Sequence, residues 1–119
     1  MDVSGVGKVG FIGLGAMGMA MAKQLLAAGF CVSGNDIRQA ALDELAAAGG
    51  TVFTDAAGVG RGANLLFVMV FDAGQIEEVL FASGVLDTLE PESTIITCST
   101  VAPSFVRGVI NLRGKVITV

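Results

Sequence analysis

The sequence predicts a single domain of the α/β class, in which helices pack on both faces of a doubly wound, mostly parallel sheet. Two observations support this prediction. Short apolar runs typical of buried strands alternate with helical patterns along the chain, and a glycine-rich turn, G-x-G-x-x-G, follows the first of these runs. A length of 119 residues suits one domain.

The first predicted strand leads directly into the glycine-rich turn. Residues 9–12 form a short apolar run suited to a strand that is buried on both faces. In the turn, Gly13 permits the tight bend, Gly15 lets the backbone approach a pyrophosphate, and Gly18 lets the next helix lie close to the sheet. The bare motif is weak in a chain with 17 glycines, so its context decides its meaning.

A helix is predicted directly after the turn. Its inward face is expected to be one apolar stripe with the spacing i, i+4, i+8 and i+11, made of Met17, Met21, Leu25 and Ala28. Gly29 then ends the helix. The free backbone N–H groups at the start of such a helix face an anion bound at the turn.

The second strand begins at residues 30–32, and a carboxylate follows it. Asp36 lies 23 residues after Gly13, about where an acid meets the ribose of a dinucleotide in a Rossmann fold. This carboxylate favours NAD because it repels a 2′-phosphate, although Arg38 nearby leaves NADP possible. Two plainer interpretations stay open: Asp36 as a solvated turn residue, and a glycine-rich turn in an ordinary α/β protein.

The rest of the chain continues the alternation. Further strands are predicted at residues 51–53, 65–71, 94–97 and 115–119, and further helices at 39–48, 56–62, 76–80 and from Pro103 onward. Thr54 or Asp55 can cap the second of these helices, and Asp72 the third. Because the ligand crevice of such a sheet lies outside the carboxyl ends of its strands, three segments are expected to meet there. These are Gly13 to Gly18, Met69 to Asp72 and Cys98 to Thr100.

Composition narrows the class of protein. The chain is 53% hydrophobic, yet no stretch approaches the roughly 20 apolar residues of a membrane span, so we expect a soluble, cytoplasmic protein without a membrane partner. With a net charge of −4 and no cluster of basic residues, the sequence offers no basic surface that would bind nucleic acid. Cys31 and Cys98 fall in apparent strands and are expected to be reduced core thiols. Without histidine, these residues offer no His-based catalysis and no His metal site, and no metal is expected.

Two longer motifs carry a resemblance to a known family. The opening GFIGLGAMG, residues 10–18, is followed by MAKQL at 21–25 and AG at 28–29. The segment STVAP, residues 99–103, resembles a D-x-S-[ST]-x-x-P substrate loop. Together these motifs resemble the amino-terminal, NAD-binding half of the β-hydroxyacid dehydrogenases, a family that includes 3-hydroxyisobutyrate dehydrogenase and whose cofactor domain is similar to that of 6-phosphogluconate dehydrogenase.

The resemblance implies a set of site residues. The implied cofactor-binding residues are Gly13, Leu14, Gly15, Ala16, Met17, Gly18, Asp36, Val70, Phe71, Gln75 and Thr100. It also implies that Ser99 binds the carboxylate of a small hydroxy acid, although Ser and Thr before a proline also often cap a helix. Thr97 stands where the family usually has aspartate and Phe71 where many members have proline, which leans toward the L-threonate dehydrogenase branch.

The resemblance also implies that the catalytic lysine lies in a helical second domain beyond these residues. Lys8, Lys23 and Lys115 are the only lysines here, and none is predicted at the carboxyl end of a strand. We therefore expect the cofactor half of an NAD-dependent oxidoreductase, without a catalytic residue of its own and inactive in isolation, from a homo-oligomeric full-length protein. The alternatives are a non-enzymatic NAD(H)-sensing module and an S-adenosylmethionine methyltransferase, which shares the glycine turn and the acid.

Overall fold

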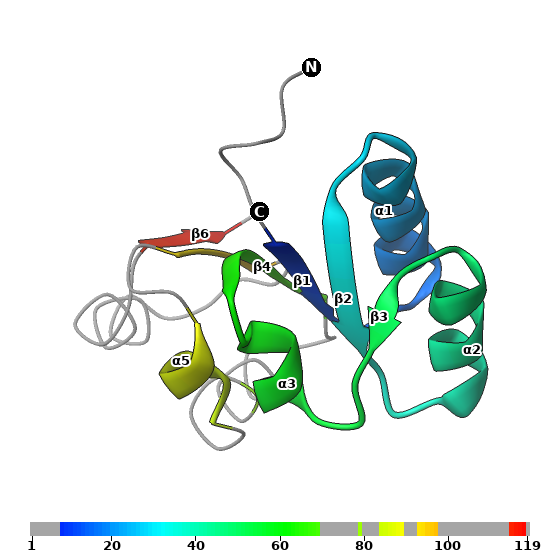
Figure 1. Ribbon diagram of the computed structural model, residues 1–119. Helices are drawn as coiled ribbons and strands as arrows, with labels where there is room; N and C mark the ends of the chain where they lie inside the picture. The colour runs from blue at the N-terminus through cyan, green and yellow to red at the C-terminus, as the bar shows by residue number, and fades with distance from the viewer. Residues whose placement is uncertain (1–7, 70–78, 80–83, 90–92, 98–114, 119) are drawn as a thin grey trace.

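The sheet is six-stranded and parallel throughout, as seen in a computed structural model that describes residues 8–69, 79, 84–89, 93–97 and 115–118 (Figure 1). The strand order is β3-β2-β1-β4-β5-β6. The strands are β1 (Lys8–Ile12), β2 (Cys31–Asn35), β3 (Thr51–Val52), β4 (Ala63–Val68), β5 (Thr94–Thr97) and β6 (Lys115–Thr118). This order places β1 beside both β2 and β4 at the centre of the sheet, which confirms the predicted doubly wound fold.

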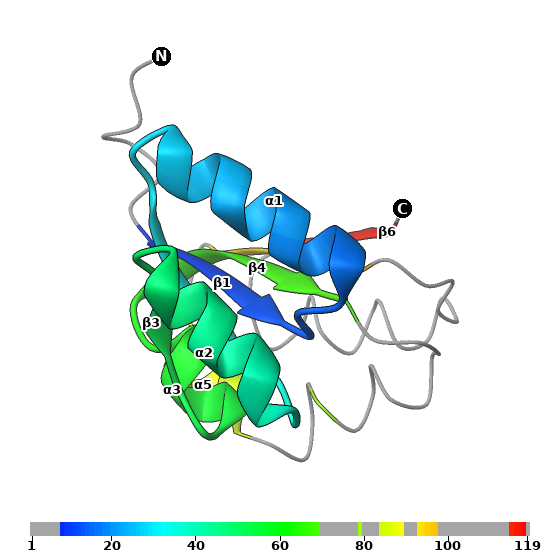
Figure 2. The same cartoon turned by 90° about the vertical axis from the view of Figure 1, so that its right-hand side faces the viewer.

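Helices lie on both faces of this sheet. They are α1 (Ala16–Ala27), α2 (Gln39–Ala47), α3 (Ala56–Gly60) and α5 (Val85–Thr88). Helices α1 and α2 cover one face, and α3 and α5 lie on the other (Figures 1 and 2). The change of face follows from right-handed crossovers, because the chain moves from β1 outward to β3 and then crosses back to β4.

Each face has its own hydrophobic core. Beneath α1 and α2 the buried residues are Val9, Phe11, Leu14, Met19, Ala22, Val32, Ala41, Leu42 and Leu45. Beneath α3 and α5 they are Ile12, Ala56, Val59, Ala63, Leu66, Val68, Val85, Leu89 and Ile95. The ring of Phe11 stacks on that of Phe67 with centroids 4.8 Å apart, which ties the two central strands together. Since β1 contributes to both cores, the turn that follows it starts from a rigid support.

The buried face of α1 agrees with the predicted stripe only in part: Met21 and Leu25 pack against the core as partly buried residues, but the other two members do not. Met17 is 68% exposed and Ala28 is exposed, whereas the helix buries Gly18, Met19 and Ala22. Gly18 lies on the buried side because the helix begins in close contact with the turn, where a Cβ would lie 2.7 Å from the carbonyl oxygen of Gly13. The expectation of a core thiol at Cys31 is also wrong, because this residue opens β2 at an exposed position.

Most other predicted elements are present with shifted ends. Asp55 caps α3 by accepting a hydrogen bond from the N–H of Gly58 at 2.8 Å, as predicted, but the helix ends at Gly60. Strand β4 begins two residues earlier than expected. Helix α5 was not predicted at all. The predicted helices at 76–80 and from Pro103, the cap Asp72 and the thiol Cys98 lie outside the described residues, apart from Val79, which packs against the second core.

Within the described part of the chain, no helix is long and apolar enough to cross a membrane.

Candidate functional site

The carboxyl ends of the central strands meet in one row. Ile12 at the end of β1 is in register with Asn35 of β2 and Val68 of β4, and Val68 is in register with Thr97 of β5. The N–H of Met69 donates to the carbonyl of Ile12 at 2.8 Å, so the residue after β4 lies directly against the turn. The expected meeting of segments is confirmed for the glycine turn and Met69, whereas Cys98 to Thr100 lie outside the described residues.

Two of the three glycines in the turn are required by the fold itself. Gly13 has a φ of +94°, and a Cβ there would lie 2.5 Å from the carbonyl oxygen of Met69. A Cβ on Gly18 would lie 2.7 Å from the carbonyl oxygen of Gly13. Any side chain at either position would push the turn away from β4 or from α1, so glycine is explained here by left-handed geometry and by close approach.

Gly15 has no such internal reason to be glycine. Its φ of −68° suits any residue, and a Cβ there would meet no atom of the described residues within 4 Å. Gly15 is the N-cap of α1, where no side chain caps the helix and the first turn holds no acidic residue. The backbone N–H groups of Ala16, Met17 and Gly18 therefore have no intrahelical partner and face the space in front of the helix. This end of α1 therefore has the unpaired N–H donors and the positive end of the helix dipole that suit an anion.

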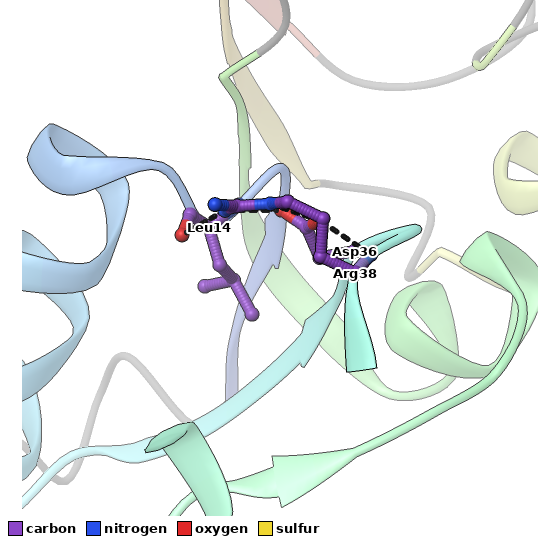
Figure 3. Close-up of polar contacts among 3 residues, drawn as sticks. All are labelled: Leu14, Asp36 and Arg38. Atoms are coloured by element: carbon purple, nitrogen blue, oxygen red, sulfur yellow. Dashed lines mark hydrogen bonds and ion pairs between the residues drawn. The ribbon is translucent and has the colours of Figure 1, made fainter. Parts of the chain in front are cut away.

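Asp36 contacts the turn directly (Figure 3). One carboxylate oxygen accepts a hydrogen bond from the N–H of Leu14 at 2.7 Å, and the other accepts one from the N–H of Arg38 at 2.8 Å. Its side chain is only 8% exposed. The carboxylate thus connects the end of β2 to the turn after β1. The interpretation of Asp36 as a merely solvated turn residue is wrong.

The guanidinium of Arg38 completes this cluster. Its Nε donates to Asp36 at 3.1 Å, and its Nη2 donates both to the carbonyl of Leu14 at 2.9 Å and to Asp36 at 3.3 Å. Figure 3 shows the guanidinium lying across the gap between Leu14 and Asp36. One side chain therefore bridges both strand ends, while 58% of its surface stays exposed. Arg38 was noted in the sequence for its position near Asp36, but this bridge to Leu14 has no sequence signal.

These contacts lower the pKa of Asp36. Burial is the largest single influence and raises the pKa, but it is outweighed by hydrogen bonds from the Arg38 guanidinium and from the N–H groups of Leu14 and Arg38, together with the positive charge of Arg38. The result lies below the usual value of 3.8. The hydrogen bond to Asp36 in turn raises the pKa of Arg38. Asp36 is therefore ionised under physiological conditions.

A pH-dependent stability follows from this shift. Because the pKa of Asp36 is lower in the folded chain than in the unfolded chain, its charged form stabilises the fold above pH 3.8, and the stabilisation is lost as the pH falls below that value. We expect Asp36→Asn to lower the free energy of unfolding by roughly 1.5–3 kcal/mol at neutral pH, the range for hydrogen bonds to charged groups. The difference from wild type should shrink in acid.

Urea unfolding at neutral pH and at about pH 3 measures this difference. Asp43→Asn is the control, since it removes an exposed carboxylate of α2 and gives the background effect of losing one negative charge. A difference between wild type and Asp36→Asn that stays the same across this pH range would contradict the assignment.

A hollow of about 460 Å³ opens beside the cluster, between α1 and α2. The start of α1 and the first turns of α2 form its walls, which include the alanine side chains Ala16, Ala20, Ala40 and Ala41. Arg38, Lys23 and Glu44 supply its charged groups. Lys23 and Glu44 pair with each other at 2.6 Å, and both are about half exposed. Neither was singled out as a site residue, because on the sequence they read as ordinary surface residues of two separate helices.

The structure places seven of the expected site residues. Those that it brings together are Gly13, Leu14, Gly15, Ala16, Met17, Gly18 and Asp36. The others lie outside the described residues, namely Val70, Phe71, Gln75, Ser99 and Thr100. Among the described residues, no three His, Cys, Asp or Glu side chains gather as a metal site would require.

A parallel sheet of this order, with a glycine turn at an uncapped helix start and an acid at the end of the second strand, defines a dinucleotide-binding domain. Residues 8–112 match the family described as the NAD binding domain of 6-phosphogluconate dehydrogenase, and the chain belongs to that family. Its cofactor is therefore NAD or the related NADP. This finding decides against the methyltransferase alternative.

Named relatives agree with this family. An L-threonate dehydrogenase from Cupriavidus necator is 40% identical over 98 residues, covering 82% of this chain and 33% of the relative. An NAD-dependent L-serine dehydrogenase from Pseudomonas aeruginosa is 36% identical over 101 residues, covering 84% of this chain and 34% of the relative. A crystal structure of 3-hydroxyisobutyrate dehydrogenase from Salmonella typhimurium superposes with a TM-score of 0.83 at 26% identity, covering 92% of this chain and 40% of that one.

The chain thus spans about a third of the length of these curated relatives. The resemblance to the hydroxyacid dehydrogenases, with L-threonate dehydrogenases among the relatives, is confirmed, and the chain corresponds to their NAD-binding domain.

Proposed function

We propose that this chain is the cofactor-binding part of a dehydrogenase that oxidises a small hydroxy acid of the L-threonate or 3-hydroxyisobutyrate type. The observation that supports cofactor binding most is Gly15. The fold gives no internal reason for glycine at this position, yet it stands at the open start of α1, where a side chain would meet a bound pyrophosphate. In this proposal the N–H groups of Ala16, Met17 and Gly18 hold the pyrophosphate, and Asp36 faces the adenosine ribose.

The substrate side of the proposal rests on the relatives. Their printed names describe dehydrogenases of L-threonate and L-serine, and a 3-hydroxyisobutyrate dehydrogenase shares the fold. All of these act on short acids that carry a hydroxyl group. We propose that Ser99 binds the substrate carboxylate and that Val70, Phe71, Gln75 and Thr100 contact the cofactor. A homo-oligomeric full-length protein and a cytoplasmic location stay predictions.

Catalysis requires a group that accepts the hydroxyl proton as hydride passes to the nicotinamide. We propose that this group is not among the 119 residues. Lys8 opens β1 and Lys115 opens β6, so both stand at the edge of the sheet opposite the glycine turn, and Lys23 is paired with Glu44. Asp36 is ionised but already accepts hydrogen bonds from the turn and from Arg38.

We therefore expect the isolated 119-residue chain to bind NADH but to show no turnover with L-threonate, 3-hydroxyisobutyrate or glycerate. A loss of positioned acid/base catalysis corresponds to about 10²- to 10⁴-fold in rate. Binding is followed by calorimetry, and turnover by the absorbance of NADH. The control is a longer protein in which these 119 residues are followed by a second domain, so that its length equals that of the relatives. This longer protein should be active with one of these acids.

The two halves of this experiment separate the alternatives. Turnover by the short chain that Ser99→Ala abolishes would place the proton acceptor among these residues and overturn the assignment. An extended protein that binds NADH but oxidises no hydroxy acid would instead favour the non-enzymatic NAD(H) sensor.

A further inference from the structure

Asp36 has no acceptor position left for a ribose as the site now stands. A carboxylate offers about four lone-pair positions for hydrogen bonds. Here its two oxygens already receive four N–H donors: those of Leu14, of the Arg38 backbone, and of Arg38 Nε and Nη2. Two of these four bonds come from one exposed side chain, which can turn away. A ribose diol that binds Asp36 must therefore displace the guanidinium of Arg38.

The guanidinium also changes the charge that the cofactor meets. An unpaired carboxylate at this position repels a 2′-phosphate and so selects NAD. Here Arg38 lies within hydrogen-bonding distance of Asp36, so the pair carries no net charge and the repulsion is cancelled. The charges of Lys23 and Glu44 also cancel each other, on the far wall of the hollow. The balance of charge beside the ribose position is thus set by Arg38.

Arg38 keeps donors available for a ligand. A guanidinium has five N–H groups, and the bonds described here use Nε and Nη2. Among the described residues, Nη1 donates to no acceptor. Arg38 lines the hollow of about 460 Å³, whose neighbouring walls are small alanine side chains such as Ala16, Ala40 and Ala41. A phosphate group fits a space of this size beside a planar, partly exposed guanidinium.

We propose that Arg38 selects the cofactor, so that this site accepts the 2′-phosphate of NADP despite the acid at the end of β2. This inference rests on the proposed function of the site. Arg38 competes with the ribose of NAD for Asp36, whereas it donates directly to the 2′-phosphate of NADP. The same side chain therefore opposes one cofactor and assists the other.

Parallel titrations of the protein with NADH and NADPH test the proposal, followed by calorimetry or by nicotinamide fluorescence, to which this chain adds no Trp or Tyr background. The affinity of the wild type for NADPH should lie within about tenfold of its affinity for NADH. Arg38→Ala should lower the affinity for NADPH by about 10- to 100-fold, the effect of losing charge-assisted hydrogen bonds. The affinity for NADH should be unchanged or higher. Arg38→Lys, which keeps the charge without the fork, should retain part of the NADPH binding.

Arg61→Ala is the matched control, because it removes the same charge from an exposed position after α3, next to Lys8 at the opposite end of the sheet. It should change neither affinity. Equal weakening of both cofactors by Arg38→Ala would mean that Arg38 only supports the turn, and wild type that binds NADH but not NADPH would overturn the proposal. Failure to bind either cofactor would instead reject the proposed function itself.

Discussion

Gly15→Val is expected to abolish NADH binding while leaving the chain folded. The two methyl groups of valine would stand in the space in front of α1, where the pyrophosphate must approach the free N–H groups of the helix. We expect affinity to fall by about 100-fold or more, which corresponds to at least about 2.7 kcal/mol. The fold should lose only about 1 kcal/mol, because the φ of −68° suits valine and no described atom lies within 4 Å of the new Cβ.

Calorimetric titration with NADH and thermal unfolding of the same preparation measure both quantities. Ala27→Val serves as the control, since it adds the same kind of bulk at an exposed position in the last turn of α1. A folded Gly15→Val protein with unchanged affinity would show that the cofactor does not lie over this turn.

Gly13→Ala is expected to act on stability instead. At a φ of +94°, alanine adopts a strained backbone conformation at a cost of about 1 kcal/mol or more. Its Cβ would also lie 2.5 Å from the carbonyl oxygen of Met69, and relieving such overpacking costs about 1–3 kcal/mol. The free energy of unfolding should therefore fall by roughly 2–4 kcal/mol.

Gly29→Ala separates these two contributions. Gly29 has a φ of +99° at the end of α1, but a Cβ there meets no described atom within 4 Å, so this variant carries the backbone strain alone. Urea unfolding should show a clearly larger loss for Gly13→Ala than for Gly29→Ala. Equal losses would mean that the turn can move away from Met69 without cost.

The sequence was sufficient to predict the sheet and the turn because both depend on local patterns. A buried strand such as β1 and a turn with glycines at fixed spacing are visible in one short stretch of chain. The inward face of α1 was predicted correctly only at Met21 and Leu25, for a related reason. Apolar periodicity locates large residues, and Met17 is large, but the close approach of the helix to the turn requires Gly18 on the buried side and leaves Met17 exposed.

The polar network of the site was less accessible to sequence reasoning. The position of Asp36 was predictable from its spacing to the glycines, but its bond to the N–H of Leu14 and the bridge made by Arg38 depend on how two loops face each other. No periodicity encodes such a contact between residues more than 20 positions apart. The same holds for Lys23 and Glu44, which meet only because α1 and α2 pack side by side.

The contact between Gly13 and Met69 has a consequence for the order of folding. Strand β1 and its turn are made early in the chain, but the wall against which the turn closes is the residue after β4, far along the sequence. Pairing of such distant strands must overcome the entropy of closing a long loop and is slow compared with the formation of α1. During refolding, recovery of cofactor binding should therefore lag behind the helical circular dichroism signal and coincide with the docking of β4 onto β1.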